Sequence, residues 1–340
     1  MNLARLPWSL SGMRRSWRLA IAAPLFLLSS AWGSDNRIKQ IAARTELHQI
    51  QTLTLSDQQF LKGDAAGGAP ITTVGQLRIA QGNGRLPVVV LQHASSGYDA
   101  RIDVWSRDLN ELGVSTFALD GFTARGLTDL NPNQELLGRL NLILDIYRSL
   151  DIVAKHPRVD PARIALMGFS RGGQATLYAS LKRFHQLWNK SGVDFAAYVP
   201  FYPDCMTSFR SEIEVVDRPI RIFGGTLDDY NPIAACKPYV ARLQAAGRDV
   251  LLTEYPNASH SFDNPLGAQP ARAQPTFESV RDCRIQEDDN GVLINVETKQ
   301  PFTYKDACVI HGPHTGYDPE AAQAATKSVN TLLKSVFKLD

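Results

Sequence analysis

The sequence predicts an α/β fold, with a mostly parallel, twisted sheet of about eight strands and helices on both faces. From about residue 86 to residue 263, short apolar runs typical of buried strands alternate with segments whose apolar residues recur at helical spacing. Such an alternation is typical of parallel sheets with crossover helices. The chain has 340 residues, of which 44% are hydrophobic and 21% charged, and this length is ample for one large core.

The first 33 residues are expected to be a secretory signal peptide, which leaves 34–340 as a single domain. They contain four arginines and no acidic residue, then an apolar run at 19–28 that is too short for a comfortable membrane span. Small residues allow cleavage before Ser34, and a retained anchor is the alternative. Cleavage removes four positive charges, so the formal net charge of +2 becomes −2. We therefore expect a periplasmic or secreted protein with no stable membrane anchor and no nucleic-acid partner.

The elements follow in order along the mature chain. An antiparallel pair of strands is expected first, at 47–55 and 71–80, joined by a flexible glycine-rich turn at 63–70. Apolar residues three or four apart predict a helix at 135–155. The other expected strands are 88–91, 114–119, 163–167, 219–223 and 249–255, and the other helices are 102–112, 171–188, 232–246 and 319–337.

A G-x-S-x-G pattern lies at one strand-to-helix junction. Gly168, Ser170 and Gly172 follow the apolar run 163–167 and precede the helical segment. A sharp turn of this kind leaves no room for side chains two residues on either side of the serine, which explains the glycines. It exposes the serine hydroxyl at the top of the sheet, beside the N-terminus of a helix. Ser170 is therefore the predicted nucleophile, and an ordinary glycine-rich turn is the alternative.

An acid and a base follow the serine in the order that a nucleophile elbow predicts. Asp228 comes just after the strand at 219–223, at the sheet edge where open α/β folds place their sites. Asp229 is the rival acid, and it is otherwise expected to cap the helix that begins near Pro232. His260 follows the last strand and is the predicted base, because a serine needs a base to take its proton.

Two backbone N–H groups are expected to form an oxyanion hole. The first is that of Arg171, directly after the nucleophile. The second lies in the small, glycine-containing loop after the strand at 88–91, and we expect it to be that of Ser95, with Ser96 as the alternative. His93 at the start of this loop is expected to brace it without transferring a proton.

These residues and their order resemble the α/β-hydrolase superfamily, and within it the dienelactone hydrolase family. The resemblance covers roughly Leu86 to Asp263 and a closing helix near the C-terminus. Founding members of that family use a cysteine nucleophile with a nearby glutamate, whereas this chain has Ser170 and, at the glutamate position, Ala94. The resemblance therefore implies a serine esterase on that scaffold.

Several loop residues are candidate substrate contacts. The family carries an aspartate-aromatic-arginine run after its equivalent of strand 114–119, and its arginine can bind a substrate carboxylate. Arg125 is the candidate for that role here, with a loop salt bridge as the alternative. Aromatic residues expected on loops at the top face could line an apolar pocket: Tyr98, Phe122, Tyr202 and Tyr230.

Four cysteines, all after the signal segment, predict two disulfides in an exported chain. We favour Cys205–Cys236, which lie at the tops of adjacent strand–helix units, and Cys283–Cys308, which flank a predicted hairpin with an Asn-Gly turn. The hairpin belongs to an insert at 264–316 that is expected near the catalytic histidine. The cysteine spacings match no zinc motif, so no metal and no cofactor is expected.

The predicted function is hydrolysis of small or medium carboxylic esters through an acyl-enzyme. A serine peptidase or amidase on the same scaffold is one alternative, although no propeller-sized region precedes the catalytic core. A noncatalytic binding protein with a hydrolase fold is another. The insert at 264–316 could also act mainly as an interaction surface.

Overall fold

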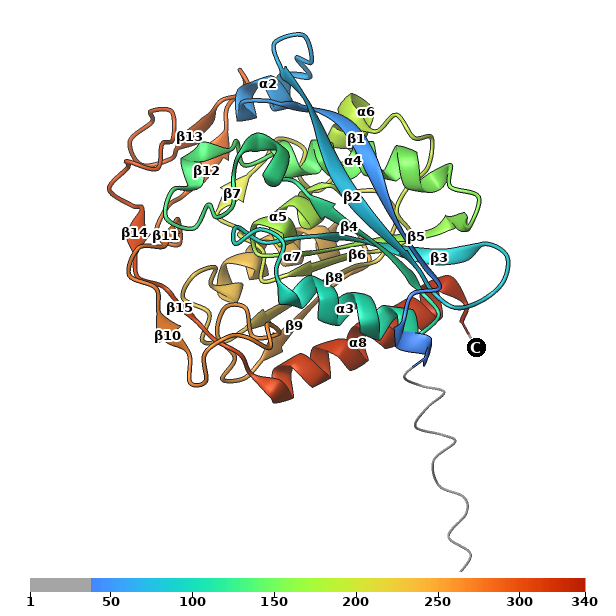
Figure 1. Cartoon of the computed structure of the whole chain (residues 1–340). Coiled ribbons are helices and arrows are strands. Elements are labelled where there is room, and N and C mark those ends of the chain that lie inside the picture. Colours follow the sequence, from blue (N-terminus) through green and yellow to red (C-terminus); the bar gives the residue numbers. More distant parts are fainter. Residues whose placement is uncertain (1–37, 340) are drawn as a thin grey trace, which may run out of the picture.

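Eight strands form one twisted sheet in the order β1-β2-β4-β3-β5-β6-β8-β9 in the computed structural model, which describes residues 38–339 (Figure 1). The predicted signal peptide lies outside the described residues. The antiparallel strands are β1 and β2, and those that follow are parallel to one another. The bounds are β1 Arg44–Thr54, β2 Ala69–Ile79, β3 Leu86–Gln92, β4 Ser115–Asp120, β5 Val159–Phe169, β6 Tyr198–Phe201, β8 Ile220–Gly225 and β9 Val250–Tyr255.

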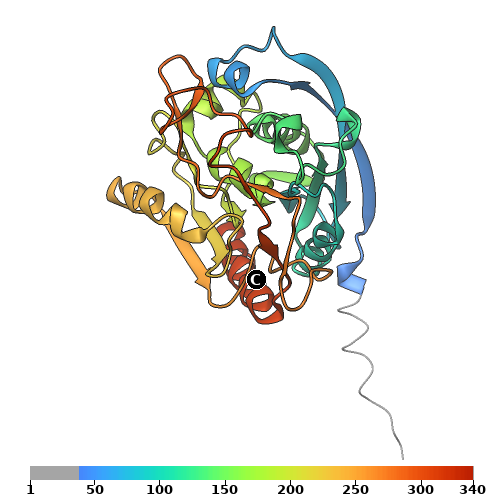
Figure 2. The same cartoon turned by 90° about the vertical axis from the view of Figure 1, so that its left-hand side faces the viewer.

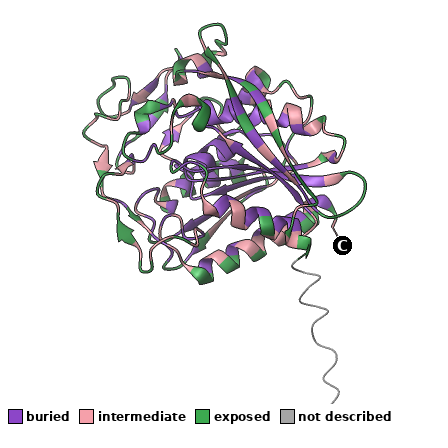
Figure 3. Ribbon diagram, viewed as in Figure 1, coloured by how far each residue is buried: buried purple, intermediate pink, exposed green. Residues whose placement is uncertain are grey.

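Helices cover both faces of this sheet, as the sequence predicts. Apolar residues of α3 and α8 pack on one face, whereas α4, α5, α6 and α7 pack on the other. Alternate residues of β3 show this division, because Val88 and Val90 face one core and Val89 and Leu91 the other. Figure 3 shows the central strands fully buried between these layers. The helices are α2 Asp57–Lys62, α3 Ala100–Glu111, α4 Asn141–Ala154, α5 Arg171–Tyr178, α6 Lys182–Trp188, α7 Lys237–Ala245 and α8 Pro319–Phe337.

Some elements differ from the sequence prediction. The helix expected at 135–155 begins only at Asn141, after a short 3₁₀ turn at Gln134–Leu136. The helix expected at 171–188 is two helices, α5 and α6. Helix α2 was not expected, although Ser56 and Gln59 form a capping box in which each side chain accepts from the other's backbone N–H.

The insert at 264–316 consists of short strand pairs at the side of the molecule that Figure 2 views directly. The predicted hairpin forms between β12 and β13, and β12 also pairs with β7 from outside the insert. In its turn Gly291 alone has a positive φ, of 69°, so the turn is not the two-residue type I′ turn that Asn-Gly indicates. The bounds are β7 Thr207–Ser208, β10 Arg272–Ala273, β11 Glu278–Ser279, β12 Ile285–Glu287, β13 Leu293–Asn295, β14 Ile310–His311 and β15 His314–Thr315.

Both favoured disulfides are present, Cys205–Cys236 and Cys283–Cys308. The first joins the segment after β6 to the short 3₁₀ helix Ile233–Cys236 before α7. The second closes a loop of 25 residues within the insert. Among residues 38–339, no helix combines the length and the apolar character that crossing a bilayer requires.

Removing the second disulfide is expected to destabilise the protein. Replacing Cys283 and Cys308 together by alanine should lower the free energy of unfolding by about 3 kcal/mol, because the cross-link restricts a loop of 25 residues in the unfolded chain. Urea unfolding of the variant and the wild type, both under oxidising conditions, measures the difference. Equal stabilities would show that the insert unfolds independently of the sheet.

Candidate active site

The turn at Ser170 has the strained geometry of a nucleophile elbow. Ser170 follows β5 directly and has φ 53° and ψ −116°, which few residues other than glycine adopt. A Cβ added to Gly168 would lie 2.2 Å from the carbonyl oxygen of Gly172, and one added to Gly172 would lie 2.3 Å from that of His93. Both positions therefore require glycine, as the sequence motif indicates.

Ser170, His260 and Asp228 form a hydrogen-bonded chain. The Ser170 hydroxyl lies 2.9 Å from Nε2 of His260, and Nδ1 of the same ring lies 2.7 Å from Oδ2 of Asp228. Because the carboxylate can only accept, Nδ1–H donates to it and Nε2 is left free to accept the serine proton. The three side chains are buried, with the Asp228 carboxylate fully so. The structure thus brings the predicted nucleophile, base and acid together.

The two consecutive aspartates have different partners. Oδ1 of Asp228 accepts the backbone N–H groups of Tyr230 and Asn231, which fixes the carboxylate while Oδ2 faces His260. Asp229 points to the insert, where it pairs with Arg281 and His314. These contacts replace the helix-capping role expected for Asp229.

Two N–H groups belong to residues that line a small cavity together with Ser170, that of Ser95 in the loop after β3 and that of Arg171 at the start of α5. Within residues 38–339, neither the Ser95 N–H nor the Arg171 N–H donates to another protein group. Helix α5 begins at Arg171, so its positive N-terminus lies at the serine. His93 braces the loop as expected, since its Nε2 accepts from the Gly121 N–H and its Nδ1 donates to the Ala94 carbonyl. Burial lowers the pKa of His93, which keeps the ring neutral in this role.

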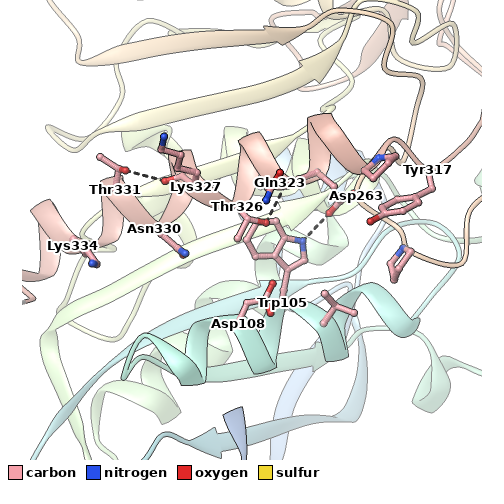
Figure 4. A pocket seen from close by; sticks show the side chains of 14 residues that line it. Trp105, Asp108, Asp263, Tyr317, Gln323, Thr326, Lys327, Asn330, Thr331 and Lys334 are labelled. Carbon is pink, nitrogen blue, oxygen red and sulfur yellow. Dashed lines mark hydrogen bonds between the residues drawn. The ribbon is translucent and has the colours of Figure 1, made fainter. Parts of the chain in front are cut away.

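Two tyrosine rings enclose the imidazole of His260. The rings of Tyr202 and Tyr230 each lie 4.7 Å from it, centroid to centroid. Below the histidine, the Tyr202 hydroxyl donates to Asp263 at 2.6 Å and accepts from Arg101 at 2.6 Å. The Trp105 N–H donates to the other oxygen of Asp263, at the wall of a surface groove of about 760 Å³ between α3 and α8 (Figure 4). This buried network supports the floor of the site.

The Tyr202 hydroxyl is expected to contribute to stability. Tyr202→Phe should lower the free energy of unfolding by about 1–3 kcal/mol, because it leaves a buried carboxylate and a buried guanidinium without their shared partner. Chemical denaturation measures the change. Tyr98→Phe is the matched control, since the Tyr98 hydroxyl is exposed and its removal should cost less than about 0.5 kcal/mol. Equal effects of the two substitutions would contradict the role given to the network.

An open cleft of about 530 Å³ leads to the serine. Ser170, His260 and Tyr230 line it from the sheet side, and Leu266 and Phe277 line it from the insert. Backbone contacts anchor the insert beside His260. Thr315 forms an isolated parallel β-bridge with His260, and the Gly316 N–H donates to the His260 carbonyl. The insert therefore lies near His260, as expected, and forms part of the cleft wall.

Four of the five candidate substrate contacts lie away from the cleft, and one of them is Tyr202, which is fully buried against the ring of His260. Arg125 is buried and forms a two-fold ion pair with Asp145 of α4, at 2.7 and 3.0 Å, so it faces away from the cleft. Phe122 is in the core, with its ring against that of His93 at 4.4 Å. Tyr98 lies on the surface beside Gln76 and Arg78. Each of these side chains contacts other groups of the protein and not the cleft. Tyr230, in contrast, lines the cleft as expected.

The Arg171 side chain is a feature that the sequence analysis did not identify. Its guanidinium is buried behind the serine, and it donates to the backbone oxygens of Gln134 and Leu137 and to the Gln134 side chain. No carboxylate of residues 38–339 lies within ion-pair distance of it. Burial lowers its pKa, yet an arginine stays charged in proteins, so a positive charge belongs to a residue that lines the same small cavity as Ser95 and Ser170.

Comparison with solved structures shows the same fold. A Klebsiella pneumoniae protein assigned as a dienelactone hydrolase is 15% identical, with a TM-score of 0.53 over 85% of this chain and 98% of that one. A dienelactone hydrolase-like promiscuous phosphotriesterase from metagenomic libraries is 15% identical, with a TM-score of 0.54 over 86% and 98%. A structure named m3DLH is 19% identical, with a TM-score of 0.55 over 86% and 98%.

The sequence itself carries the family assignment. No curated protein matches the chain, but the sequence profile of the dienelactone hydrolase family matches residues 75–288, which is well over half of the chain. The matched region begins in β2 and ends in the insert, so it includes Ser170, Asp228 and His260. The chain belongs to the dienelactone hydrolase family.

Proposed function

We propose that this carboxylic ester hydrolase is an exported serine esterase that cleaves small or medium esters through an acyl-enzyme. The observation that carries the proposal is the continuous hydrogen-bonded chain from Ser170 through His260 to Asp228, at the floor of an open cleft. A serine hydroxyl is a weak nucleophile until an oriented base takes its proton, and this chain supplies both the base and its orienting acid.

The reaction proceeds in two steps. His260 removes the proton of Ser170 while the serine oxygen attacks the ester carbonyl, and the Ser95 and Arg171 N–H groups stabilise the oxyanion. The imidazolium, held by Asp228, then gives its proton to the departing alcohol, and the acyl group stays on the serine. Water, deprotonated by His260, attacks the acyl-enzyme, the carboxylic acid leaves, and the proton returns to Ser170.

The cleft supports the size of the substrate. Its volume of about 530 Å³ lies within the range of ligand sites for small molecules, and its opening leaves the serine accessible to an ester. Leu266, Phe277 and Tyr230 provide apolar surface, while Asn131 and Gln274 provide polar groups. Export is supported by the two disulfides, which form and persist in oxidising compartments.

Covalent labelling tests the proposal directly. A fluorophosphonate probe should modify Ser170 and no other serine, because among residues 38–339 the hydroxyl of Ser170 alone is bonded to the buried imidazole of His260. Ser261 lines the same cleft and serves as the internal control in peptide mapping. A parallel panel of p-nitrophenyl esters and p-nitroanilides separates esterase from amidase activity. Absence of label at Ser170, or faster turnover of the anilides, would overturn the proposal.

A further inference from the structure

A group of three potential metal ligands lies outside the active site. Glu46 and His48 are two residues apart on β1, so their side chains are on the same face of the strand, and His156 lies just beyond α4. Oε2 of Glu46 is 3.0 Å from Nε2 of His48 and 3.1 Å from Nε2 of His156. All three ligand atoms lie within 4.8 Å of one another, and the side chains are largely buried.

The position of these residues in the fold is unusual for polar groups. The inward face of β1 continues from Glu46 and His48 to Ile50 and Thr52, both of which are buried against the core. The outward residues between them, such as Leu47, are exposed. His48 lies opposite Gly75 of β2, and the ring of Phe117, which fills the space over that glycine, lies 5.9 Å from the imidazole, centroid to centroid. Strand β1 and the turn after α4 therefore hold three donor atoms together, partly shielded from solvent.

The donor set and its spacing suit a zinc-like ion. Zinc accepts two imidazoles and one carboxylate at about 2.0–2.1 Å, with a fourth position left to water. In a tetrahedral site the ligand atoms are then about 3.3 Å apart, close to the two distances from Glu46 Oε2 to the histidines.

We propose that Glu46, His48 and His156 form a binding site for a divalent transition-metal cation of the zinc type, which joins the edge strand β1 to the end of α4. Arg44 pairs with Oε1 of Glu46, the carboxylate oxygen that contacts neither histidine, and it keeps that contact when the ion binds Oε2. The Arg158 N–H, which is 3.2 Å from Nδ1 of His156, loses that weak bond because Nδ1 must carry the proton when Nε2 holds the metal.

The site is separate from the proposed catalytic centre. His156 lies just before β5 and Ser170 directly after it, so the two sites are at opposite ends of that strand. A metal at the first therefore does not occupy the substrate cleft. Its expected effect is on stability, since it cross-links an edge strand to the helix layer and binds the folded chain alone.

Zinc titration of the mature protein, stripped of metal with a chelator, tests the site. Isothermal calorimetry should show one Zn²⁺ per chain, and saturating Zn²⁺ should raise the melting temperature by about 2–5 °C. His48→Ala and His156→Ala should each weaken binding at least about tenfold, since losing even an outer partner of a metal ligand costs 10–100-fold. The same titration on Ser170→Ala protein should be unchanged, which separates this result from that on the esterase proposal.

His311→Ala is the matched control, because His311 is an exposed histidine of the insert and should leave zinc binding intact. If either alanine variant fails to fold, Glu46→Gln, which keeps the shape of the side chain, should show the same loss of affinity. No heat of binding in the wild type would overturn the proposal. So would undiminished binding to the folded double variant His48→Ala/His156→Ala, since the ion would then be held elsewhere.

Discussion

Ser170→Ala is expected to lower kcat for p-nitrophenyl acetate by about 10⁶-fold, because alanine removes the hydroxyl that is bonded to the buried imidazole of His260. The remaining rate should come from the oxyanion hole and from binding alone. Initial rates at saturating substrate measure the loss. The side chain contributes no other hydrogen bond in the described part of the chain, so the melting temperature should stay within a few degrees of the wild type.

The matched control for this substitution is Ser261→Ala. Ser261 follows His260 and lines the same cleft, but its hydroxyl contacts no base among the described residues. This variant should keep kcat within about tenfold of the wild type, because the Ser261 hydroxyl takes no part in the proposed reaction. If Ser170→Ala protein retained more than a few per cent of the wild-type rate, another group would have to be the nucleophile and the mechanism would be wrong.

Asp228→Asn is expected to lower kcat by about 10⁴-fold with little change in structure. The carbonyl oxygen of the introduced amide can still accept the backbone N–H groups of Tyr230 and Asn231, so the amide NH₂ then faces His260. An NH₂ group donates to Nδ1 and places the ring proton on Nε2, where it blocks acceptance of the serine proton. Initial rates give the loss, and circular dichroism checks the fold.

Asp229→Asn provides the comparison. It changes the adjacent carboxylate in the same way but touches Arg281 and His314 of the insert and not the catalytic imidazole. Its kcat should fall by less than about tenfold, and any larger change should be in KM, because the insert lines the cleft. Equal losses in kcat for the two variants would show that the assignment of Asp228 as the orienting acid is incorrect.

The core of the fold was predictable because its signals are local. Buried parallel strands are continuous apolar runs in the sequence. Each of the five predicted parallel strands overlaps an observed strand. Strand β6 has only four residues and was missed, since a run that short is not distinct from a loop. The start of α4 was predicted six residues too early, at 135 instead of Asn141. Gly138 lies between these two positions, inside the apolar pattern on which the prediction was based.

The site was predictable where backbone geometry, or the order of residues at the ends of the strands, determines it. The glycines around Ser170 are required by close backbone contacts, so the motif carries the geometry with it. Loop side chains are different, because their direction depends on partners far along the chain. Arg125 binds Asp145, twenty residues away, and no spacing rule indicates that pair. The same holds for the Tyr202 network, whose members come from three separate segments.

The neighbouring aspartates have a consequence for engineering. Asp228 serves the reaction, while Asp229 fastens the 264–316 segment through Arg281 and His314. That segment is also tied into the core, because Val280, Ile285 and Leu293 are buried among core residues and Glu287 pairs with Arg183 and Arg210. Changes meant to alter selectivity should therefore be confined to exposed residues of the segment that line the cleft, such as Leu266, so that both the fastening and the proton-transfer chain are left in place.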